Sequence, residues 1–247
     1  MGDEAPPCDE ALREKFRKVH WVPLESNPEV LTKFARQVGM PDGWEFTDIF
    51  GFDPELLAMV PPGCTAVTLL FDSSSANIRQ FKAEQRTKVE ASGQTIAPEL
   101  RYMRQFVGNA CGTIATIHCL ANSAEVMGLP ADSPLGKFLA QTSGKSPEEF
   151  GAMLVDASEL HSASEASAQE GQTAAPEADA DIHHHFIAFV EKGGDLYELD
   201  GAKAFPINHG PLGGSLLEAA VRVIKANFVD KDPESIHFNM MALVKAD

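Results

Sequence analysis

The segment from Gly112 to Met127 constrains the fold of this 247-residue chain more than any other. Its apolar residues lie nearly all round the expected helix: Ile114, Ile117, Leu120, Ala121 and Val126. Gly128 follows as a stop signal, and a helix that is apolar on every side is normally enclosed in a core. The rest of the chain therefore has to surround this helix, and it is long enough to bury one substantial core.

A cysteine stands at the expected start of that helix, in the sequence Asn109-Ala110-Cys111-Gly112. Asn109 is a natural N-cap, and the positive end of the helix with its free N–H groups favours a thiolate at Cys111. Ala110 and Gly112 are small, so a carbonyl carbon has room beside the sulfur. A free cysteine by itself is more often a buried structural residue, but this placement predicts a nucleophile.

A histidine and an acid follow in a predicted hairpin. His185 directly precedes the apolar strand 186–190, Gly193-Gly194 forms the turn, and Asp200 ends the second strand, 196–199. Antiparallel pairing brings the start of one strand beside the end of the other, so we expect Asp200 near His185. Glu198 is the rival acid. Cysteine, histidine and aspartate together suit a thiol hydrolase in which the acid orients the imidazole that activates the sulfur.

Two further patterns lie near these residues. Gln105 offers a neutral amide that could join the Cys111 backbone N–H in holding an oxyanion, although such a residue is often only a polar surface residue. The run His183-His184-His185 suggests metal binding, yet alternate side chains of a strand point to opposite faces, and no other cysteine or histidine pair has ligand spacing. We therefore expect neither a metal nor a cofactor.

Composition and charge exclude several classes of protein. The net charge is −16 and no run of Lys or Arg occurs, so we expect no nucleic-acid partner. A basic partner suits this charge, although acidity can serve solubility alone. The four cysteines have no CxxC spacing and no apolar run approaches the roughly 20 residues of a membrane span. We expect free thiols and no membrane partner, in a cytoplasmic protein that could also enter the nucleus.

Helix-boundary residues and apolar patterns along the chain predict its domains and secondary-structure elements. Residues 1–14 have no hydrophobic period and suggest a flexible N-terminal extension, followed by a single domain over 15–247. A helix is predicted over 28–38, with Asn27 and Pro28 at its start and Gly39 at its end. The apolar run 64–71 predicts a buried strand. Further elements are expected over 134–141, 147–160, 215–228 and 236–244. Residues 161–182 contain no Lys, Arg or aromatic residue and no periodic apolar face, which predicts a mobile loop within the domain rather than a linker between two domains.

Several motifs together carry a resemblance: WVPLESNPEV from Trp21, DPELLAMVP from Asp53, QFVGNACGTIATIHCLAN from Gln105, EGQTAAPE in the long loop, and HFIAFV with DLYELDGAKAFPINHG from His185. The chain resembles the ubiquitin carboxyl-terminal hydrolases, and within them the isozyme L3 type. The resemblance implies a thiol-dependent deubiquitinase with Cys111 as nucleophile, His185 as base, Asp200 as orienting acid and Gln105 as oxyanion donor.

The family fold that the resemblance implies is a papain-like α/β (α+β) domain, with an antiparallel central sheet flanked by helices on both faces and a knotted chain path. In relatives, the loop corresponding to 161–182 crosses the active site and restricts it to small or unfolded leaving groups on the C-terminal glycine of ubiquitin. Ubiquitin is the implied partner of a protein that we expect to be a monomer. Nedd8 stays open as a second substrate, and a non-catalytic ubiquitin-binding module of the same fold stays open as the alternative.

The resemblance also implies a surface for ubiquitin. Its expected substrate-binding residues are Pro23, Leu24, Glu25, Ser26, Glu29, Asp48, Asn109 and His184. The acidic members could meet the arginines of ubiquitin, an attraction that salt would weaken. The chain departs from the family pattern at His184, because relatives usually have an apolar residue directly before the catalytic histidine. This departure concerns recognition of the substrate tail and the preference among ubiquitin-like proteins.

Overall fold

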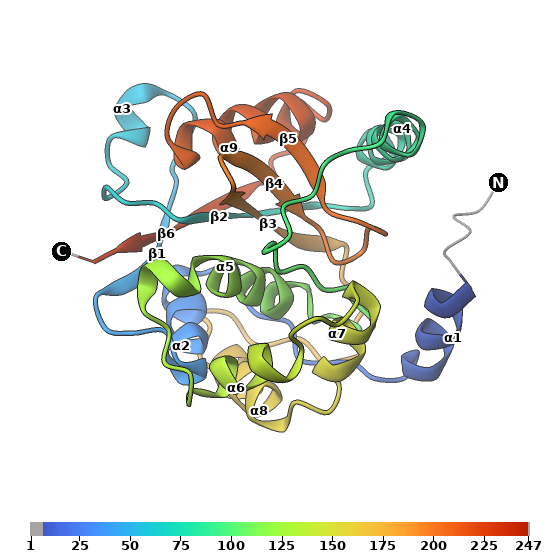
Figure 1. Ribbon diagram of the computed structural model, residues 1–247. Helices are drawn as coiled ribbons and strands as arrows, with labels where there is room; N and C mark the ends of the chain where they lie inside the picture. Colours follow the sequence, from blue (N-terminus) through green and yellow to red (C-terminus); the bar gives the residue numbers. More distant parts are fainter. Residues whose placement is uncertain (1–6, 247) are drawn as a thin grey trace.

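The computed structural model describes residues 7–246 and is built around one six-stranded antiparallel sheet with the order β1-β6-β2-β3-β4-β5. Helices lie on both of its faces (Figure 1). The predicted sheet with flanking helices is therefore confirmed. The strands are β1 (Trp44–Asp48), β2 (Ala66–Asp72), β3 (His184–Lys192), β4 (Asp195–Leu199), β5 (Ile207–Pro211) and β6 (Asn239–Lys245).

Two hydrophobic cores fill the space between the sheet and its two helical layers. The larger core lies against the helices α2 (Pro28–Val38), α5 (Cys111–Met127), α6 (Pro134–Gln141), α7 (Pro147–Leu154) and α8 (Ser158–Ala168). The smaller core lies on the opposite face, with α3 (Pro54–Leu57), α4 (Ala76–Ser92), α9 (Leu216–Ile224) and the π-helical turn η1 (Lys225–Val229). Helix α5 is buried between the sheet and its neighbouring helices, as its apolar pattern predicts (Figure 1).

Local signals in the sequence place several of these elements. The side chain of Asn27 accepts a hydrogen bond from the backbone N–H of Glu29, and Gly39 ends α2 with a positive φ of 121°. The hairpin of β3 and β4 forms in the expected register, with Ala188 paired to Leu199. Both the predicted helix and the predicted hairpin are confirmed.

The N-terminal region differs from the prediction. Helix α1 (Pro7–Phe16) occupies residues that were expected to belong to the flexible extension, whereas residues 1–6 of that extension lie outside the described part. Asp9 is completely buried beside Arg104, with 2.6 Å between Oδ2 and Nη2, and the ring of Phe16 contacts that of Phe106. The helix is thus anchored by one buried ion pair and one aromatic contact, neither of which a search for hydrophobic periodicity detects.

The second difference concerns residues 161–182. Helix α8 continues to Ala168, so only residues 169–183 form the loop. The buried residues Leu160, Ser164 and Ser167 follow a helical period, and the hydroxyls of Ser164 and Thr113 lie 2.6 Å apart. Small side chains thus let α8 lie close to its neighbours, and a bulky apolar face is unnecessary. We call residues 169–183 the crossover loop.

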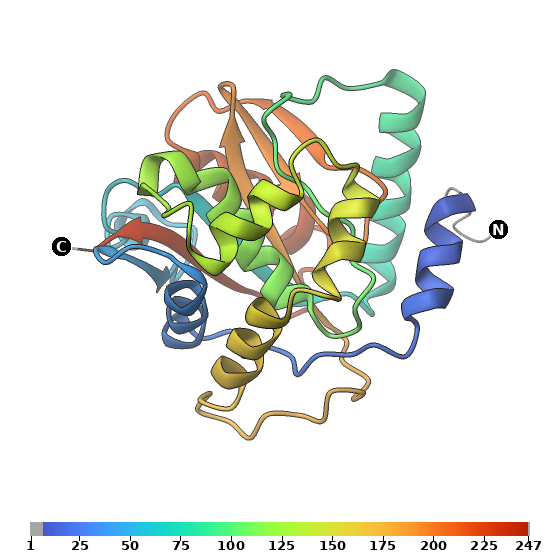
Figure 2. The same cartoon turned by 60° about the horizontal axis from the view of Figure 1, so that its bottom comes forward.

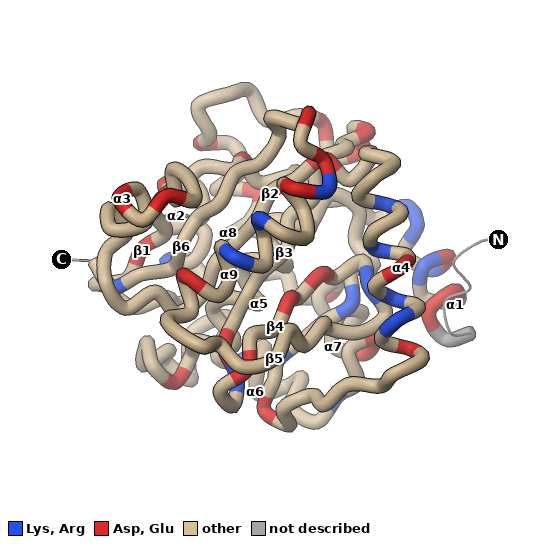
Figure 3. The backbone as a smooth tube through the Cα atoms, turned by 90° about the horizontal axis from the view of Figure 1, so that it is seen from above, with Lys and Arg blue, Asp and Glu red and all other residues tan. Residues whose placement is uncertain are grey.

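Charge is unevenly distributed over this fold. Lys and Arg follow one another along α4, whereas Asp and Glu are scattered over most other segments (Figure 3). Within residues 7–246, no helix is long and apolar enough to cross a membrane.

Candidate active site

Cys111 is the first residue of α5 and is buried where the helix meets the sheet. A Cβ at Gly112 would lie 3.2 Å from the Leu24 side chain and 3.3 Å from that of Phe186, so glycine permits the close approach of these segments. Burial opposes ionisation of the thiol. The hydrogen bond and charge of His185, with the backbone N–H groups of Phe186 and Gly112, outweigh burial and lower the pKa of Cys111.

His185 lies near the start of β3 and pairs with Phe71 of β2. Its Nε2 atom is 2.7 Å from Oδ1 of Asp200, which leaves Nδ1 as the ring nitrogen for Cys111. The Phe71 ring meets the imidazole edge-on, with centroids 5.8 Å apart. Burial acts to lower the pKa of His185, but the Asp200 carboxylate and Cys111 raise it to about 9. The site thus favours a thiolate facing an imidazolium.

Asp200 directly follows β4 and its side chain is almost completely buried. Oδ1 accepts hydrogen bonds from His185 and from the backbone N–H of Ala202, the latter at 2.9 Å. Burial acts to raise the pKa of Asp200, but Lys82 and His185 hold it well below its usual range. The rival acid Glu198 lies 3.0 Å from His209 instead, so the expected proximity of Asp200 and His185 is confirmed.

Gln105 lies in the irregular segment before α5. Its backbone N–H donates to the carbonyl of Gly201 at 2.8 Å, and its Nε2 donates to Val107 at 3.0 Å. A Cβ at Gly201 would lie only 3.1 Å from that of Gln105, so glycine permits this close approach. One N–H of the Gln105 amide is thus donated to Val107, and the amide carries a second N–H besides it.

Sequence reasoning missed Tyr102, which ties the acid to the segment of Gln105. Its hydroxyl lies 2.8 Å from the carbonyl oxygen of Asp200 and 2.6 Å from that of Lys203. Its ring stacks on His118 of α5, whose Nε2 accepts the backbone N–H of Met103 at 3.0 Å. The three segments that carry Cys111, Gln105 and Asp200 are therefore joined behind the site. No local sequence signal marks this role.

The role expected for Asn109 as N-cap is wrong. Ala110 occupies the cap position without a side-chain hydrogen bond, and Asn109 adopts a left-handed φ of 57° that asparagine tolerates better than most residues. The Asn109 amide instead donates to the carbonyls of Ala178 and Ala180, at 2.9 and 2.8 Å. Asn109 thus fixes the crossover loop beside the start of α5.

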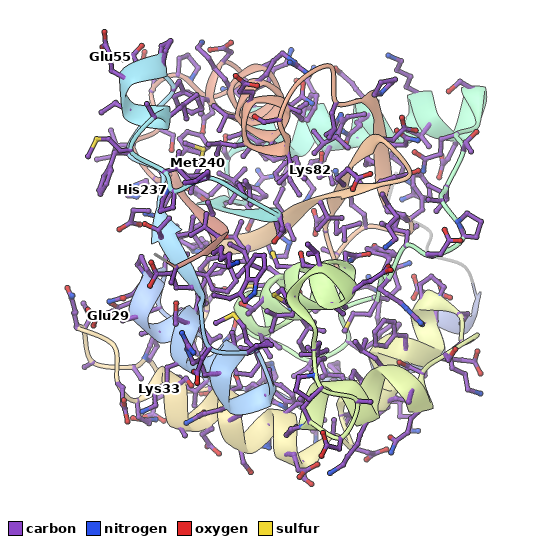
Figure 4. The ribbon with its side chains drawn as sticks, turned by 60° about the vertical axis from the view of Figure 1, so that its left-hand side comes forward. Glu29, Lys33, Glu55, Lys82, His237 and Met240 are labelled. Carbon is purple, nitrogen blue, oxygen red and sulfur yellow. The ribbon has the colours of Figure 1, made fainter. Side chains whose placement is uncertain are left out.

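A pocket opens beside Cys111 beneath the crossover loop. Gly112 and Phe186 line it from the body of the protein, and Thr173, Pro176 and Ile182 line it from the crossover loop. Five of the predicted substrate-binding residues also line it: Pro23, Leu24, Glu25, Ser26 and His184. Three of the predicted substrate-binding residues do not line this pocket: Glu29, Asp48 and Asn109. Glu29 projects from the outer face of α2 together with Lys33 (Figure 4), and Asp48 ends β1.

His184 lies at the outer end of the pocket, where its ring contacts that of His237 with centroids 5.3 Å apart. Within residues 7–246, no cluster of three or more His, Cys, Asp or Glu side chains has an arrangement that could hold a metal ion. The histidine run is therefore divided between the active site, where His185 lies, and the pocket rim.

A buried cysteine at a helix N-terminus, an imidazole on an antiparallel strand and a buried carboxylate define a papain-like cysteine hydrolase. The sequence profile of the ubiquitin carboxyl-terminal hydrolases, family 1, matches residues 21–229. This chain belongs to that family, as its motifs predict.

Curated relatives match over most of their length. A probable ubiquitin carboxyl-terminal hydrolase of Dictyostelium discoideum is 41% identical, with 92% of this chain and 88% of the relative covered. A ubiquitin carboxyl-terminal hydrolase of Drosophila melanogaster is 42% identical over 92% and 98%. The human isozyme L1 is 36% identical over 91% and 98%.

The fold is also similar to that of a solved structure, the catalytic domain of Trichinella spiralis UCH37 bound to ubiquitin vinyl methyl ester. The TM-score is 0.72 at 20% identity, and the match covers 96% of this chain and all of the other. At this identity the likeness concerns the fold alone.

Proposed function

We propose that this protein is a deubiquitinating cysteine hydrolase that cleaves adducts from the C-terminal glycine of ubiquitin through a thioester. The observation that carries the proposal is the convergence of Cys111, His185 and Asp200 beside a pocket that Cys111 itself helps to line. Family membership supports ubiquitin as the substrate.

The chemistry follows from the protonation states of these side chains. The Cys111 thiolate attacks the glycine carbonyl carbon, while the backbone N–H of Cys111 and the Gln105 amide stabilise the oxyanion. The His185 imidazolium gives its proton to the departing group as the bond to the carbonyl carbon breaks. Water then attacks the thioester with His185 as general base, which releases the ubiquitin carboxylate and restores the thiolate facing an imidazolium.

The position of the crossover loop is an argument that the enzyme acts on small or unfolded leaving groups. It is held at one end by Glu25 and at the other by Asn109, so a substrate has to pass beneath a strap fixed on both sides of the pocket. A folded adduct requires both sets of bonds to open, whereas a thin tail requires much less. The pocket residues Pro23, Leu24, Glu25, Ser26 and His184 are the proposed tail contacts, with Glu29 and Asp48 on the proposed surface for the ubiquitin body.

Nedd8 is a second proposed substrate, because the resemblance implies that related members process it, and His184 lines the pocket where the resemblance implies an apolar residue. A comparison of kcat/KM on the fluorogenic C-terminal amides of ubiquitin and Nedd8 measures the preference. Restoration of an apolar side chain by His184→Leu shows how much of that preference resides in this position.

The test of the proposed function is hydrolysis of a ubiquitin C-terminal amide by wild-type protein and by Cys111→Ala. We expect the variant to lose turnover while calorimetry still detects ubiquitin binding. Cys64→Ala is the matched control, because Cys64 does not line the pocket and burial raises the pKa of its thiol to about 12. Undiminished turnover by Cys111→Ala would refute the assigned nucleophile, and binding without turnover in the wild type would indicate the non-catalytic module.

A further inference from the structure

A lysine lies directly behind the acid of the site. Nζ of Lys82, on α4, is 2.6 Å from Oδ2 of Asp200, on the opposite side of the carboxylate from His185. The Lys82 side chain is 22% exposed and that of Asp200 is 1% exposed, so the contact is shielded from water. The approach is that of a close ion pair, although its angles fall outside those of a hydrogen bond.

Helix α4 is held to the body by few apolar contacts, which makes this polar contact notable. Ile78 is its one fully buried residue in the described part, and the helix stands at the outer edge of the molecule (Figures 1 and 2). Lys82 and Gln85 lie on the same face and reach Asp200 and Glu198 at the end of β4. Lys82 lies on the α9 side of the sheet (Figure 4).

Lys82 also contacts the ring that supports the imidazole. Its Nζ lies 5.5 Å from the centroid of the Phe71 ring, and that ring meets His185 edge-on. Lys82 therefore contacts both groups that determine the orientation of His185: the carboxylate at Nε2 and the aromatic edge beside the imidazole.

The other ionisable groups around Asp200 are already committed or neutral. Lys203 is paired with Glu198. His118 of α5 is buried, which lowers its pKa to about 4 and leaves it neutral at pH 7. The Tyr102 hydroxyl contacts the backbone carbonyl of Asp200 rather than its carboxylate. Within residues 7–246, Lys82 is thus the one permanent cation paired with this side chain.

A count of charges shows what this cation does. With Cys111 as thiolate, His185 as imidazolium and Asp200 as carboxylate, the three groups carry a net charge of −1. A buried net charge is costly, and Lys82 makes the group neutral. Without Lys82, the excess negative charge favours uptake of a proton, and the thiolate is the group that then loses its reactive form.

We propose that Lys82 is a positioning residue for the triad: its ammonium group on Oδ2 keeps Asp200 charged and directs Oδ1 at His185, and so sustains the thiolate facing the imidazolium. This role rests on the proposed function for its consequence in catalysis, but its effect on the Cys111 thiol can be measured without ubiquitin. Docking of α4 is thereby coupled to the reactivity of Cys111.

Three variants test the proposal: Lys82→Met, Lys82→Arg and the control Lys88→Met, which removes an exposed lysine of the same helix. The first readout is the pH dependence of Cys111 alkylation by iodoacetamide, followed by mass spectrometry of its peptide. The second is kcat and KM on a ubiquitin C-terminal amide, and urea unfolding shows whether each variant is folded. Lys82→Gln provides a second uncharged variant if Lys82→Met fails to fold.

We expect Lys82→Met to move the acid limb of the alkylation profile upward by about one pH unit, equivalent to a roughly tenfold loss of thiolate at a fixed low pH. At that same low pH its kcat should fall by a similar factor while KM changes little, because Lys82 does not line the tail pocket. Lys82→Arg should keep most of the activity, and Lys88→Met should match the wild type.

An alkylation profile of Lys82→Met or Lys82→Gln that matches the wild type would overturn the proposal. So would a loss of kcat that Lys82→Arg does not restore and that leaves the profile unmoved, since that pattern indicates a structural role alone. If the wild type fails to hydrolyse ubiquitin while the profile still shifts in Lys82→Met, the proposed function falls and the role of Lys82 stands.

Discussion

Oε2 of Glu25 accepts two hydrogen bonds from Thr173, one from its backbone N–H at 2.9 Å and one from its hydroxyl at 2.6 Å. Oε1 accepts the backbone N–H of Gln172 at 3.2 Å. Glu25 is therefore occupied by the crossover loop. It is also an expected contact for an arginine of ubiquitin, and since one carboxylate cannot fully serve both partners, we infer that substrate binding loosens the loop.

The first prediction concerns this contact. Glu25→Gln should increase hydrogen exchange at the backbone amides of residues 172 and 173, because a neutral amide accepts more weakly than a carboxylate. Glu29→Gln, which leaves the loop contacts untouched, is the control. The hydrogen bonds from Thr173 lower the pKa of Glu25, so their stabilisation is present above pH 4.5 and is lost as the pH falls below it. Equal exchange in both variants would remove Glu25 from control of the loop.

The second prediction concerns the pH dependence of kcat/KM. The pKa of Cys111 is lowered and that of His185 is raised to about 9, so the reactive pair of thiolate and imidazolium is present between the pKa of the thiol and about pH 9. The rate should be level there and should fall above about pH 9, where His185 loses the proton that the leaving group needs. It should fall in acid as the thiolate is protonated. A rate that keeps climbing through pH 9, as for an ordinary thiol, contradicts this state.

The pKa shifts of His185 and Asp200 also make the stability of the fold depend on pH. The raised pKa of His185 stabilises the fold fully below about pH 6.5 and the contribution is lost as the pH rises through about 9. The lowered pKa of Asp200 acts in the opposite sense, because its contribution is present above pH 3.8 and is lost in acid. The contribution of this pair to stability is therefore greatest between pH 3.8 and about pH 6.5.

The third prediction concerns Gln105. Replacement by alanine should lower kcat by about 10²- to 10³-fold with little change in KM, because an oxyanion donor acts chiefly in the transition state. Single-turnover kinetics with a ubiquitin C-terminal amide measures the chemical step. Gln105→Glu keeps the shape of the side chain but lacks the donor, so it should be similarly impaired. Retention of activity in both variants means that the oxyanion is held elsewhere.

Much of this site could be predicted from the sequence because its signals are local. The start of α5 at Cys111, the turn at Gly193-Gly194 and the register that brings Asp200 to His185 all follow from short patterns and strand pairing. The contacts of Tyr102 and Lys82 could not be predicted. Each contact joins segments that are far apart in the chain. Nothing in the sequence around Tyr102 or Lys82 distinguishes it from an ordinary core tyrosine or surface lysine.

The errors had physical causes as well. Asn109 fits the N-cap pattern, but a left-handed backbone turns its amide toward the crossover loop instead. The sequence predicts one helix over 147–160, whereas α7 ends at Leu154 and α8 extends from Ser158 to Ala168, because small residues can bury a helix face without an apolar stripe. Helix α1 was assigned to the extension because a buried ion pair, rather than an apolar stripe, holds it.

The fourth prediction tests that ion pair. Asp9→Ala removes the nearer carboxylate from the buried Arg104 guanidinium and leaves only Glu148, 3.8 Å away, so the free energy of unfolding should fall by about 3 kcal/mol, the low end of the cost of breaking a buried ion pair. Urea denaturation measures the loss, with the exposed neighbour Glu10→Ala as the control. The double variant Asp9→Leu, Arg104→Met should recover most of the stability. Equal stability of Asp9→Ala and Glu10→Ala would mean that α1 is not anchored by this pair.

The most direct test of the whole account is mass spectrometry after reaction with a ubiquitin carrying a C-terminal vinyl methyl ester. We predict one ubiquitin added per chain, with the adduct on the peptide that contains Cys111, absent in Cys111→Ala and present in Cys64→Ala. An adduct on another cysteine, or none in a folded wild-type protein, contradicts the account.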